Sequence, residues 1–231
     1  RTVGCNARKG PHGSIIKDPV ARLHTEGGHI GVGWSSIDKP GAQALLGSPV
    51  SSLFYLPDGS LETGRAVDLP LWDLAAKITG QPLYRLLGAR GSRDVELYDG
   101  SIYIDDLGVG DAEAQEIFRD EVATGQRFGF RNFKIKIGRG ARWMPVMEGV
   151  ERDILVIRTV REAAGEDAKI MIDANNGMTL NIAKEILRRC ADLDIYWLEE
   201  PFPEDPGYNE PLRAFIDENG YRTLVADGES G

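Results

Sequence analysis

The stretch FKIKI, residues 133–137, decides the fold because it sets two lysines in an otherwise apolar strand. Side chains alternate across a strand, so Lys134 and Lys136 share one face and the three apolar residues share the other. The apolar face suits packing against helices. We therefore expect both lysines to point into the interior of a closed sheet.

Strand-like and helical stretches alternate along the chain from about residue 95 onward. Helices are expected at about 111–124, 149–164, 179–190 and around 211–218. This alternation predicts a parallel sheet with covering helices. Polar residues recur at the strand ends about every 30 residues, close to the roughly 31 residues per unit of a (β/α)8 barrel. A doubly wound sheet has similar spacing, but no glycine-rich phosphate loop follows the first strand.

The first 92 residues differ from the rest, with short strands, a turn at Gly27-Gly28 and a closing helix in VDLPLWDLAAKITG. They predict an N-terminal α+β domain over 1–92, which GARGSRD joins to a barrel domain over 93–231. The predicted fold class is α/β: an α+β domain plus a (β/α)8-type barrel with only about its first five strands. Such a barrel would have open sheet edges, so we expect the natural gene product to continue beyond Gly231.

Three acidic residues stand at the carboxyl ends of later strands, where barrel active sites are built. In KIMIDAN, IYWLEE and TLVADGE, strand parity turns Asp173, Glu199 and Glu229 inward, and Val225 and Asp227 are expected on the face of Glu229. Inward carboxylates repel one another strongly, and a hard divalent cation relieves this repulsion. Oxygen ligands without neighbouring His or Cys favour Mg²⁺, with Mn²⁺ as a substitute, over zinc.

The two lysines of FKIKI gain a chemical role beside such a cation. Each positive charge disfavours protonation of its neighbour, so the pKa of one lysine is expected to fall far enough for it to act as a base. The other would stay charged and hold an anionic group of the substrate. Taken alone, the lysines fit an exposed edge strand better, and each acid also fits a cap, a turn or a surface position.

The K-x-K of FKIKIG, followed by IDAN, WLEEP and ADGE, resembles the mandelate racemase/muconate lactonizing branch of the enolase superfamily. The helix in LWDLAAKITGQPLYRLLG is similar to the end of that family's capping domain, and the likeness covers roughly residues 20–231. The resemblance implies an α+β cap over a modified barrel, and abstraction of the proton α to a carboxylate. It also implies metal ligands at Asp173, Glu199 and Glu229, a base at Lys136 and a carboxylate-binding partner at Lys134.

Further residues are expected to assist this site. Asn175 and Glu200 would orient neighbouring groups. Arg8 and His12 would belong to a segment that covers the substrate in the family, although an ordinary flexible loop fits them as well. After FKIKIG, Arg139 and Arg142 are expected in a solvated loop.

The predicted reaction is Mg²⁺-dependent α-proton abstraction from a hydroxy acid of the sugar-acid class, giving an ene-diolate that then loses a β-hydroxyl. Enzymes of this family carry a second acid or base on strands six to eight, and nothing here matches it, so racemisation or epimerisation stays open. Two other possibilities are a Schiff-base aldolase that uses Lys136 and a non-catalytic chain that keeps half of a metal site.

Composition limits the partners and the setting. The 231 residues carry a net charge of −9 and have a pI near 4.9, which argues against a nucleic-acid partner. No apolar run approaches a membrane span. Two cysteines are too few for a disulfide scaffold, and Cys190 is expected in the core. We expect a cytoplasmic homo-oligomer that takes a small carboxylate substrate.

Overall fold

The computed structural model describes residues 5–6, 10–11, 18–56 and 58–228. Three predicted site residues, Arg8, His12 and Glu229, lie outside the described residues. None of the helices in the described part is both long and apolar enough to cross a lipid bilayer.

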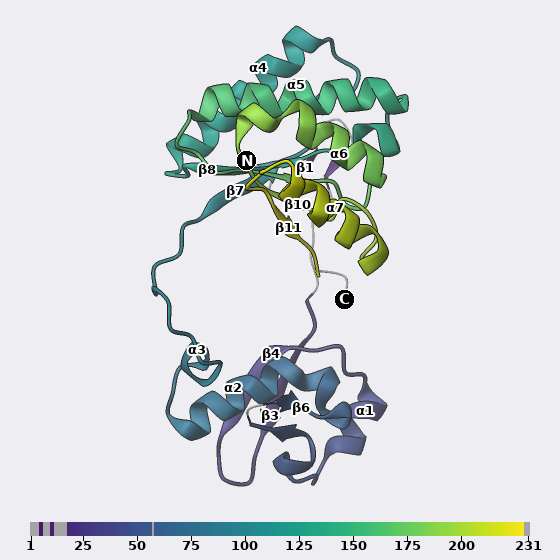
Figure 1. Cartoon of the computed structure of the whole chain (residues 1–231). Helices are drawn as coiled ribbons and strands as arrows, with labels where there is room; N and C mark the ends of the chain where they lie inside the picture. The colour runs from purple at the N-terminus through teal and green to yellow at the C-terminus, as the bar shows by residue number, and fades with distance from the viewer. Residues whose placement is uncertain (1–4, 7–9, 12–17, 57, 229–231) are drawn as a thin grey trace. The chain divides into compact units, whose positions relative to one another are not determined.

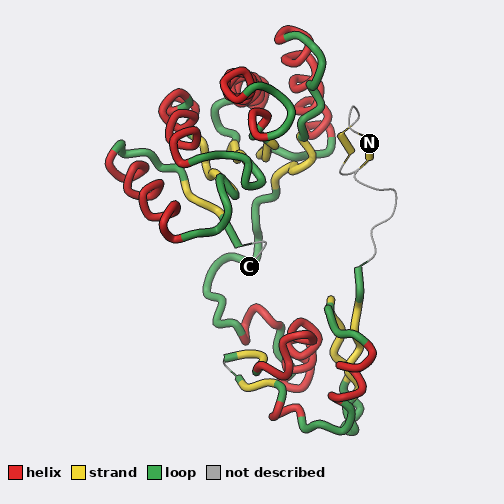
Figure 2. The backbone as a smooth tube through the Cα atoms, turned by 90° about the vertical axis from the view of Figure 1, so that its right-hand side faces the viewer, coloured by secondary structure: helices red, strands yellow, loops and turns green. Residues whose placement is uncertain are grey.

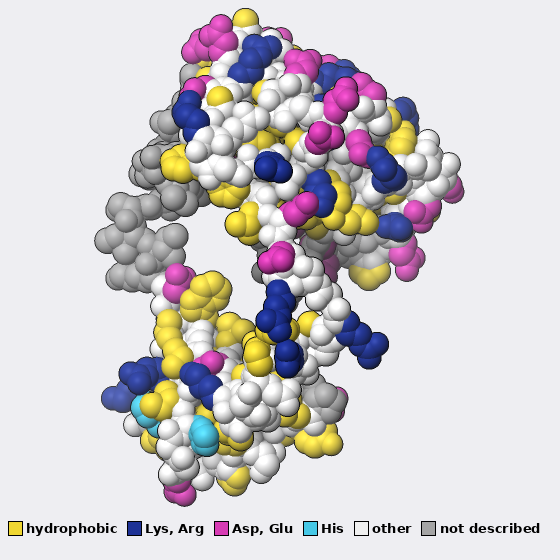
Figure 3. All heavy atoms as spheres, turned by 90° about the vertical axis from the view of Figure 1, so that its left-hand side faces the viewer, with side chains coloured by type: hydrophobic (Ala, Val, Ile, Leu, Met, Phe, Trp, Pro, Cys, Tyr) yellow, Lys and Arg dark blue, Asp and Glu magenta, His cyan; other side chains and the backbone are white. Residues whose placement is uncertain are grey.

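The chain divides into two compact units, Ile15–Val95 and Arg1–Ser14 with Glu96–Gly231. On the face that Figure 3 presents, acidic and basic side chains are interspersed over the surface. The negative net charge is therefore not gathered into one patch on that face.

The unit Ile15–Val95 is built on an antiparallel hairpin against which one long helix packs (Figure 1). Gly28 forms the hairpin turn at φ +81°, a conformation that favours glycine, so the predicted turn is confirmed. Gly31 lets the helix lie close, because a Cβ there would be 2.1 Å from the Pro70 carbonyl oxygen. The elements are β3 (Val20–His24), β4 (Ile30–Trp34), α1 (Lys39–Leu45), β5 (Phe54–Tyr55), β6 (Gly59–Ser60), α2 (Asp68–Thr79), α3 (Leu83–Leu86) and 3₁₀ turns at Val50–Ser52 and Glu62–Val67.

The second unit is built on a five-stranded parallel sheet in the order β7-β8-β9-β10-β11. Each strand pairs with the strand that precedes it in the chain, as in the wall of a barrel, whereas a doubly wound sheet reverses its order partway. The predicted parallel sheet is confirmed. Its strands are β7 (Tyr98–Ile102), β8 (Asn132–Lys136), β9 (Ile170–Asp173), β10 (Ile195–Glu199) and β11 (Leu224–Ala226).

The long helices of this unit all lie on one face of the sheet, as Figures 1 and 2 show from two directions. A doubly wound sheet would carry helices on both faces, so this one-sided layer also matches a barrel wall. The helices are α4 (Asp111–Arg127), α5 (Val146–Ala164), α6 (Leu180–Arg189) and α7 (Pro206–Glu218), with 3₁₀ turns at Arg139–Ala141 and Ala191–Leu193 and a small antiparallel pair of β1 (Cys5–Asn6) and β2 (Gly10–Pro11).

The helix α7 begins earlier than the sequence indicated. Pro211 was expected near its start, but it lies inside the helix, which begins at Pro206. Asp205 caps this start by accepting the Gly207 N–H at 2.6 Å. The pair Asp205-Pro206 therefore marks the start of α7, because it supplies both a cap and a proline at the first helical position.

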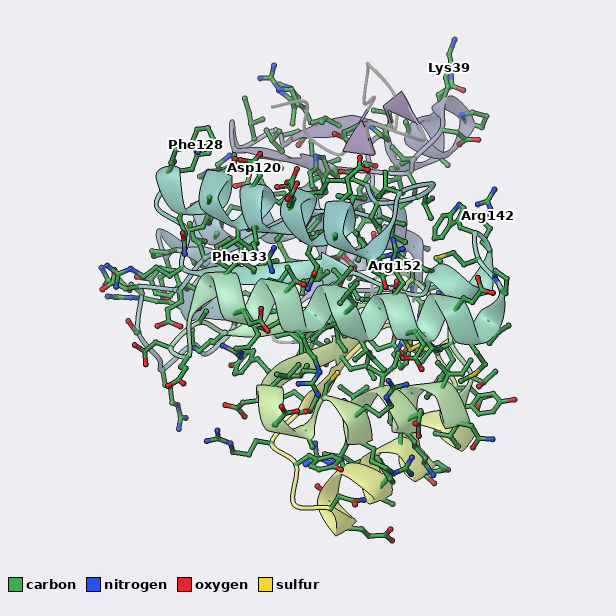
Figure 4. The ribbon with its side chains drawn as sticks, turned by 90° about the horizontal axis from the view of Figure 1, so that it is seen from above. Lys39, Asp120, Phe128, Phe133, Arg142 and Arg152 are labelled. Carbon is green, nitrogen blue, oxygen red and sulfur yellow. The ribbon has the colours of Figure 1, made fainter. Side chains whose placement is uncertain are left out.

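The face of the sheet under the helices is apolar, as strand parity predicted for β8 and β9. Phe133 and Ile135 are fully buried in the core between sheet and helices, together with Ile172 of β9. Figure 4 shows Phe133 in the seam between α4 and α5. Gly125 of α4 permits this close approach, because a Cβ there would lie 2.7 Å from the Phe133 ring. The lysines of β8 are thereby left on the opposite face.

The predicted parity is wrong for β11. Val225 aligns with Leu198 and packs against the core under the helices, so it does not face inward. Asp227 also lies on the helix side, where it accepts a hydrogen bond of 3.5 Å from Asn209 of α7. Ala226 is the residue that aligns with Glu199. The register of neighbouring strands sets the inward face here, and a count along one short strand does not show that register.

Cys190 lies in the core, as predicted, at 1% exposure. Burial raises the pKa of its thiol to about 12. The thiol is therefore protonated at neutral pH and acts as a small apolar side chain.

Candidate functional site

The carboxyl ends of the middle strands present two rows of aligned residues on the face opposite the helices. Residues aligned across parallel strands project to the same side, so each row gathers its side chains. The row at the strand ends consists of Lys136, Asp173, Glu199 and Ala226, and the row beneath it consists of Lys134, Met171, Trp197 and Leu224.

Lys134 joins the two acidic residues of the upper row. Its Nζ lies 2.6 Å from Glu199 Oε1 and 3.1 Å from Asp173 Oδ2. The two carboxylates cannot be farther apart than the sum of those distances. Asp173 is fully buried, and the side chains of Lys134 and Glu199 are each 14% exposed, so solvent screens these contacts weakly. The predicted convergence of Asp173 and Glu199 is therefore present.

Lys136 lies on the other side of Asp173. Its Nζ forms an ion pair with Asp173 Oδ2 and donates a hydrogen bond of 2.7 Å to Asn175 Oδ1. Asn175 in turn donates from its backbone N–H to Asp173 Oδ1 at 3.1 Å and from Nδ2 to Glu200 Oε2 at 3.0 Å. Asn175 and Glu200 thus contact the groups that they were expected to orient.

The backbone just after β9 and β10 adopts a left-handed conformation. Asn175 and Glu200 have φ values of 42° and 41°, the left-handed region that costs most residues about 1–2 kcal/mol. Glu200 is held there by backbone hydrogen bonds, from its N–H to Ala226 O at 3.0 Å and from Asn176 N–H to its own carbonyl at 2.7 Å. Strained backbone at the ends of strands that carry acidic groups points to a functional site.

The charges at this centre stabilise one another. Burial alone would lower the pKa of Lys134, but its hydrogen bond to Glu199 and the charge of Asp173 outweigh burial and raise that pKa above its ordinary value. Burial would raise the pKa of Asp173, but the hydrogen bond and charge of Lys136, with the charge of Lys134, lower it. Lys134 therefore suits the predicted role of the lysine that stays charged.

The donor set at the strand ends fits magnesium. Asp173 and Glu199 already converge on one cation, the ammonium of Lys134, and both present carboxylate oxygens to it. Proteins usually bind Mg²⁺ through one or two carboxylates, with water and substrate completing an octahedron. Within the described part of the chain no group of three or more His, Cys, Asp or Glu residues is placed to hold a metal ion. The third predicted ligand, Glu229, lies outside that part.

Trp197 is a site residue that the sequence reasoning did not assign. Its Nε1–H donates a hydrogen bond of 3.0 Å to Glu199 Oε2, and its ring packs edge-on against Tyr98 at 5.4 Å between centroids. The signal was present in IYWLEE, because Trp197 and Glu199 share strand parity. Trp197 of the lower row therefore holds the carboxylate of Glu199 in the upper row.

A buried ionic cluster behind Lys136 corrects the expectation for the loop after β8. Arg139 was expected in solvent, but it is fully buried. Its guanidinium lies 2.7 Å from both Asp106 Oδ1 and Asp153 Oδ1, and it donates to the Lys136 carbonyl at 3.4 Å. Both aspartates are distant in sequence, so no local pattern announced this burial. Arg142 is exposed, as expected, and Figure 4 shows it at the outer end of the loop.

The cluster also involves α5. Arg152, in the seam between α4 and α5 in Figure 4, pairs with Asp106 at 2.9 Å. Burial would raise the pKa of Asp106, but its hydrogen bonds and charge contacts with Arg139 and Arg152 lower it. Asp153 accepts the Gly138 N–H at 2.9 Å. The backbone that immediately follows Lys136 is thus held by buried charges.

The chain matches known proteins over most of its length. Residues 118–230 match the family described as "Enolase C-terminal domain-like". The chain is 32% identical over 211 residues to the arabinonate dehydratase of Saccharolobus solfataricus, which covers 80% of this chain and 52% of that enzyme. It is 38% identical over 173 residues to the D-galactarolactone cycloisomerase of Agrobacterium fabrum, which covers 74% of this chain and 41% of that enzyme. The chain spans about half the length of the curated relatives it matches.

A solved structure agrees with these matches. A mandelate racemase/muconate lactonizing protein from Geobacillus sp. Y412MC10, complexed with magnesium/tartrate, superposes with a TM-score of 0.80 at 38% identity. The match covers 99% of this chain and 61% of that one.

Proposed function

The chain belongs to the mandelate racemase/muconate lactonizing branch of the enolase superfamily, and on that premise we propose that it serves Mg²⁺-dependent removal of the proton α to a carboxylate in a hydroxy acid. The substrate class is a sugar acid, and loss of a β-hydroxyl follows. One observation supports this most strongly: Lys134, Lys136, Asp173 and Glu199 meet on the face of the sheet opposite the helices.

Each residue has a part in the proposed step. Mg²⁺ bound by Asp173, Glu199 and Glu229 would withdraw charge from the substrate carboxylate and so stabilise the ene-diolate. Lys134 stays an ammonium and holds a carboxylate oxygen. Lys136, in its neutral amine form, would take the α-proton on Nζ and become an ammonium, and Asn175, itself held by Glu200, keeps that nitrogen in place. Mn²⁺ is proposed as a substitute cation.

The domain plan is part of the same proposal. Residues 1–92 would form the α+β capping domain, and residues 93–231 would belong to the barrel domain. Arg8 and His12 would then stand in a segment that covers the substrate. The division of the chain between Val95 and Glu96 supports the boundary near residue 92, whereas Arg1–Ser14 group with Glu96–Gly231.

The direct test is exchange of the α-proton in D₂O, followed by NMR with the full-length protein, Mg²⁺ and a set of aldonic and uronic acids. At least one acid should lose its α-proton signal and yield a keto acid, and excess EDTA should stop both. Exchange that is indifferent to EDTA would contradict the proposed role of the cation.

A second candidate reaction, cycloisomerisation or epimerisation, has support from the 38% identity to a cycloisomerase. It shares the α-proton step, so exchange would occur without keto acid. A Schiff-base aldolase at Lys136 would instead give a covalent adduct that borohydride traps. The products of the same incubations therefore separate the candidates.

Replacing Asp173 by asparagine should weaken Mg²⁺ binding by about 10-fold or more. Mutating even a residue that only supports a metal ligand typically lowers metal affinity by about 10- to 100-fold. The substitution removes a negative charge at the point where two carboxylates converge. Isothermal titration calorimetry with Mg²⁺ measures the change. Asp217→Asn is the matched control, because Asp217 is exposed on α7 and pairs only with Arg213 among the ion pairs of the described residues. Equal affinities for the two variants would remove Asp173 from the ligand set.

A further inference from the structure

The indole of Trp197 contacts the candidate ligand Glu199 through its polar edge. Trp197 lies two residues before Glu199 in β10 and in the row beneath it, so both side chains rise from the same face. The Nε1–H donates to Glu199 Oε2 at 3.0 Å. A hydrogen bond to an ionised oxygen is about twice as strong as a neutral one. The indole is thus well placed to set the direction of this carboxylate.

The two oxygens of Glu199 have different partners. Oε1 meets the ammonium of Lys134 at 2.6 Å, and Oε2 meets the indole. A carboxylate held at both oxygens cannot rotate about its last bond without losing one contact. The indole N–H is a neutral hydrogen-bond donor. It therefore orients Glu199 Oε2 without adding a positive charge that would repel a cation.

The indole is itself held in place by other rings. Tyr98 packs edge-on against it, with centroids 5.4 Å apart and planes at 87°, and Tyr196 lies 5.5 Å away at 45°. The Tyr98 ring also lies under the Lys134 ammonium at 5.7 Å. The two groups that hold Glu199 therefore share one aromatic support.

We propose that Trp197 is a positioning residue, which fixes the Glu199 carboxylate in the orientation that receives the divalent cation. This rests on the proposed function, because it takes Glu199 to be a ligand. In this proposal Trp197 of the lower row orients Glu199 of the upper row before the cation binds.

The test is Mg²⁺ binding by calorimetry to wild type and Trp197→Phe, in the full-length protein without substrate. Phenylalanine keeps a ring against Tyr98 but removes the N–H donor. The dissociation constant should rise about 10-fold, the lower end of the effect of groups that orient metal ligands. The control is Trp143→Phe, which alters an exposed tryptophan in the loop before α5 and should leave the affinity unchanged.

Tryptophan fluorescence gives an independent readout. Mg²⁺ should change the emission of wild type and of Trp143→Phe, and this response should disappear in Trp197→Phe. If Trp197 served stability alone, Trp197→Phe would have a lower unfolding midpoint but the same Mg²⁺ affinity as wild type.

The outcomes separate this inference from the proposed function. If wild type binds no Mg²⁺, both are overturned. If wild type binds Mg²⁺ and Trp197→Phe binds it equally well, only the role of Trp197 is overturned. Should Trp197→Phe fail to fold, Tyr98→Leu replaces it, because that variant leaves the N–H but removes the ring that holds the indole. Unchanged Mg²⁺ affinity in Tyr98→Leu would then overturn the inference.

Discussion

Replacing Lys136 by methionine is expected to slow α-proton exchange by about 10²- to 10⁴-fold, the usual contribution of a general base. Methionine keeps much of the side-chain length and removes the amine. Mg²⁺ affinity should stay the same or tighten, because the substitution removes a positive charge that pairs with Asp173. NMR exchange rates and calorimetry on the same protein measure both effects.

Two comparisons make this result specific. Lys184→Met, on the helix layer where Lys184 stacks over Phe215, should exchange at the wild-type rate. Lys134→Met should raise the substrate KM more than it lowers kcat, since Lys134 is proposed to hold the carboxylate. If Lys134→Met stops exchange while Lys136→Met preserves it, the two lysines have the opposite roles.

Arg139→Met should destabilise the unit that holds the five-stranded parallel sheet by about 3–5 kcal/mol, the cost of removing one partner from a buried ion pair. Asp106 and Asp153 are both buried, and each would lose the guanidinium that now lies 2.7 Å away. Since whole domains are stable by about 5–15 kcal/mol, this is a large share of the total. The free energy of unfolding from urea titration, read by a probe in this unit, measures the loss.

Arg142→Met is the matched control for Arg139, because it alters an exposed arginine of the same loop and should change stability by less than about 0.5 kcal/mol. Adding Asp153→Asn to Arg139→Met should recover part of the loss, since it neutralises the carboxylate that loses its charged partner, whereas Asp106 keeps Arg152 at 2.9 Å. A change below about 1 kcal/mol for Arg139→Met would mean that the cluster is not an energetic support of the loop.

The sequence was sufficient wherever the signal was local. The alternation in FKIKI predicted which side chains face the helices, because the pleat of a strand fixes that pattern within a few residues. The repeated strand and helix predicted the parallel sheet in the same way. Lys134, Lys136, Asp173 and Glu199 could be placed together because polar side chains at the ends of parallel strands meet at one edge.

The sequence was insufficient where the answer depended on partners far along the chain. Arg139 is buried because Asp106 and Asp153 neutralise it, and nothing in FKIKIGRGAR shows this. Val225 faces the helices because the register of β10 with β11 aligns it with Leu198, and a count along three residues does not fix that register. Trp197 shares strand parity with Glu199 in IYWLEE, but only the contact of its N–H with Glu199 reveals its role.

The sequential order of the strands affects how the protein is made. Because β8, β9, β10 and β11 each pair with the strand that precedes them, each of these pairings can form as soon as the later strand has been synthesised. Lys134 and Lys136 are synthesised first, then Asp173, then Glu199. Asp173 and Glu199 therefore each follow in the chain the lysine with which they pair, so a partner of opposite charge precedes each of these carboxylates.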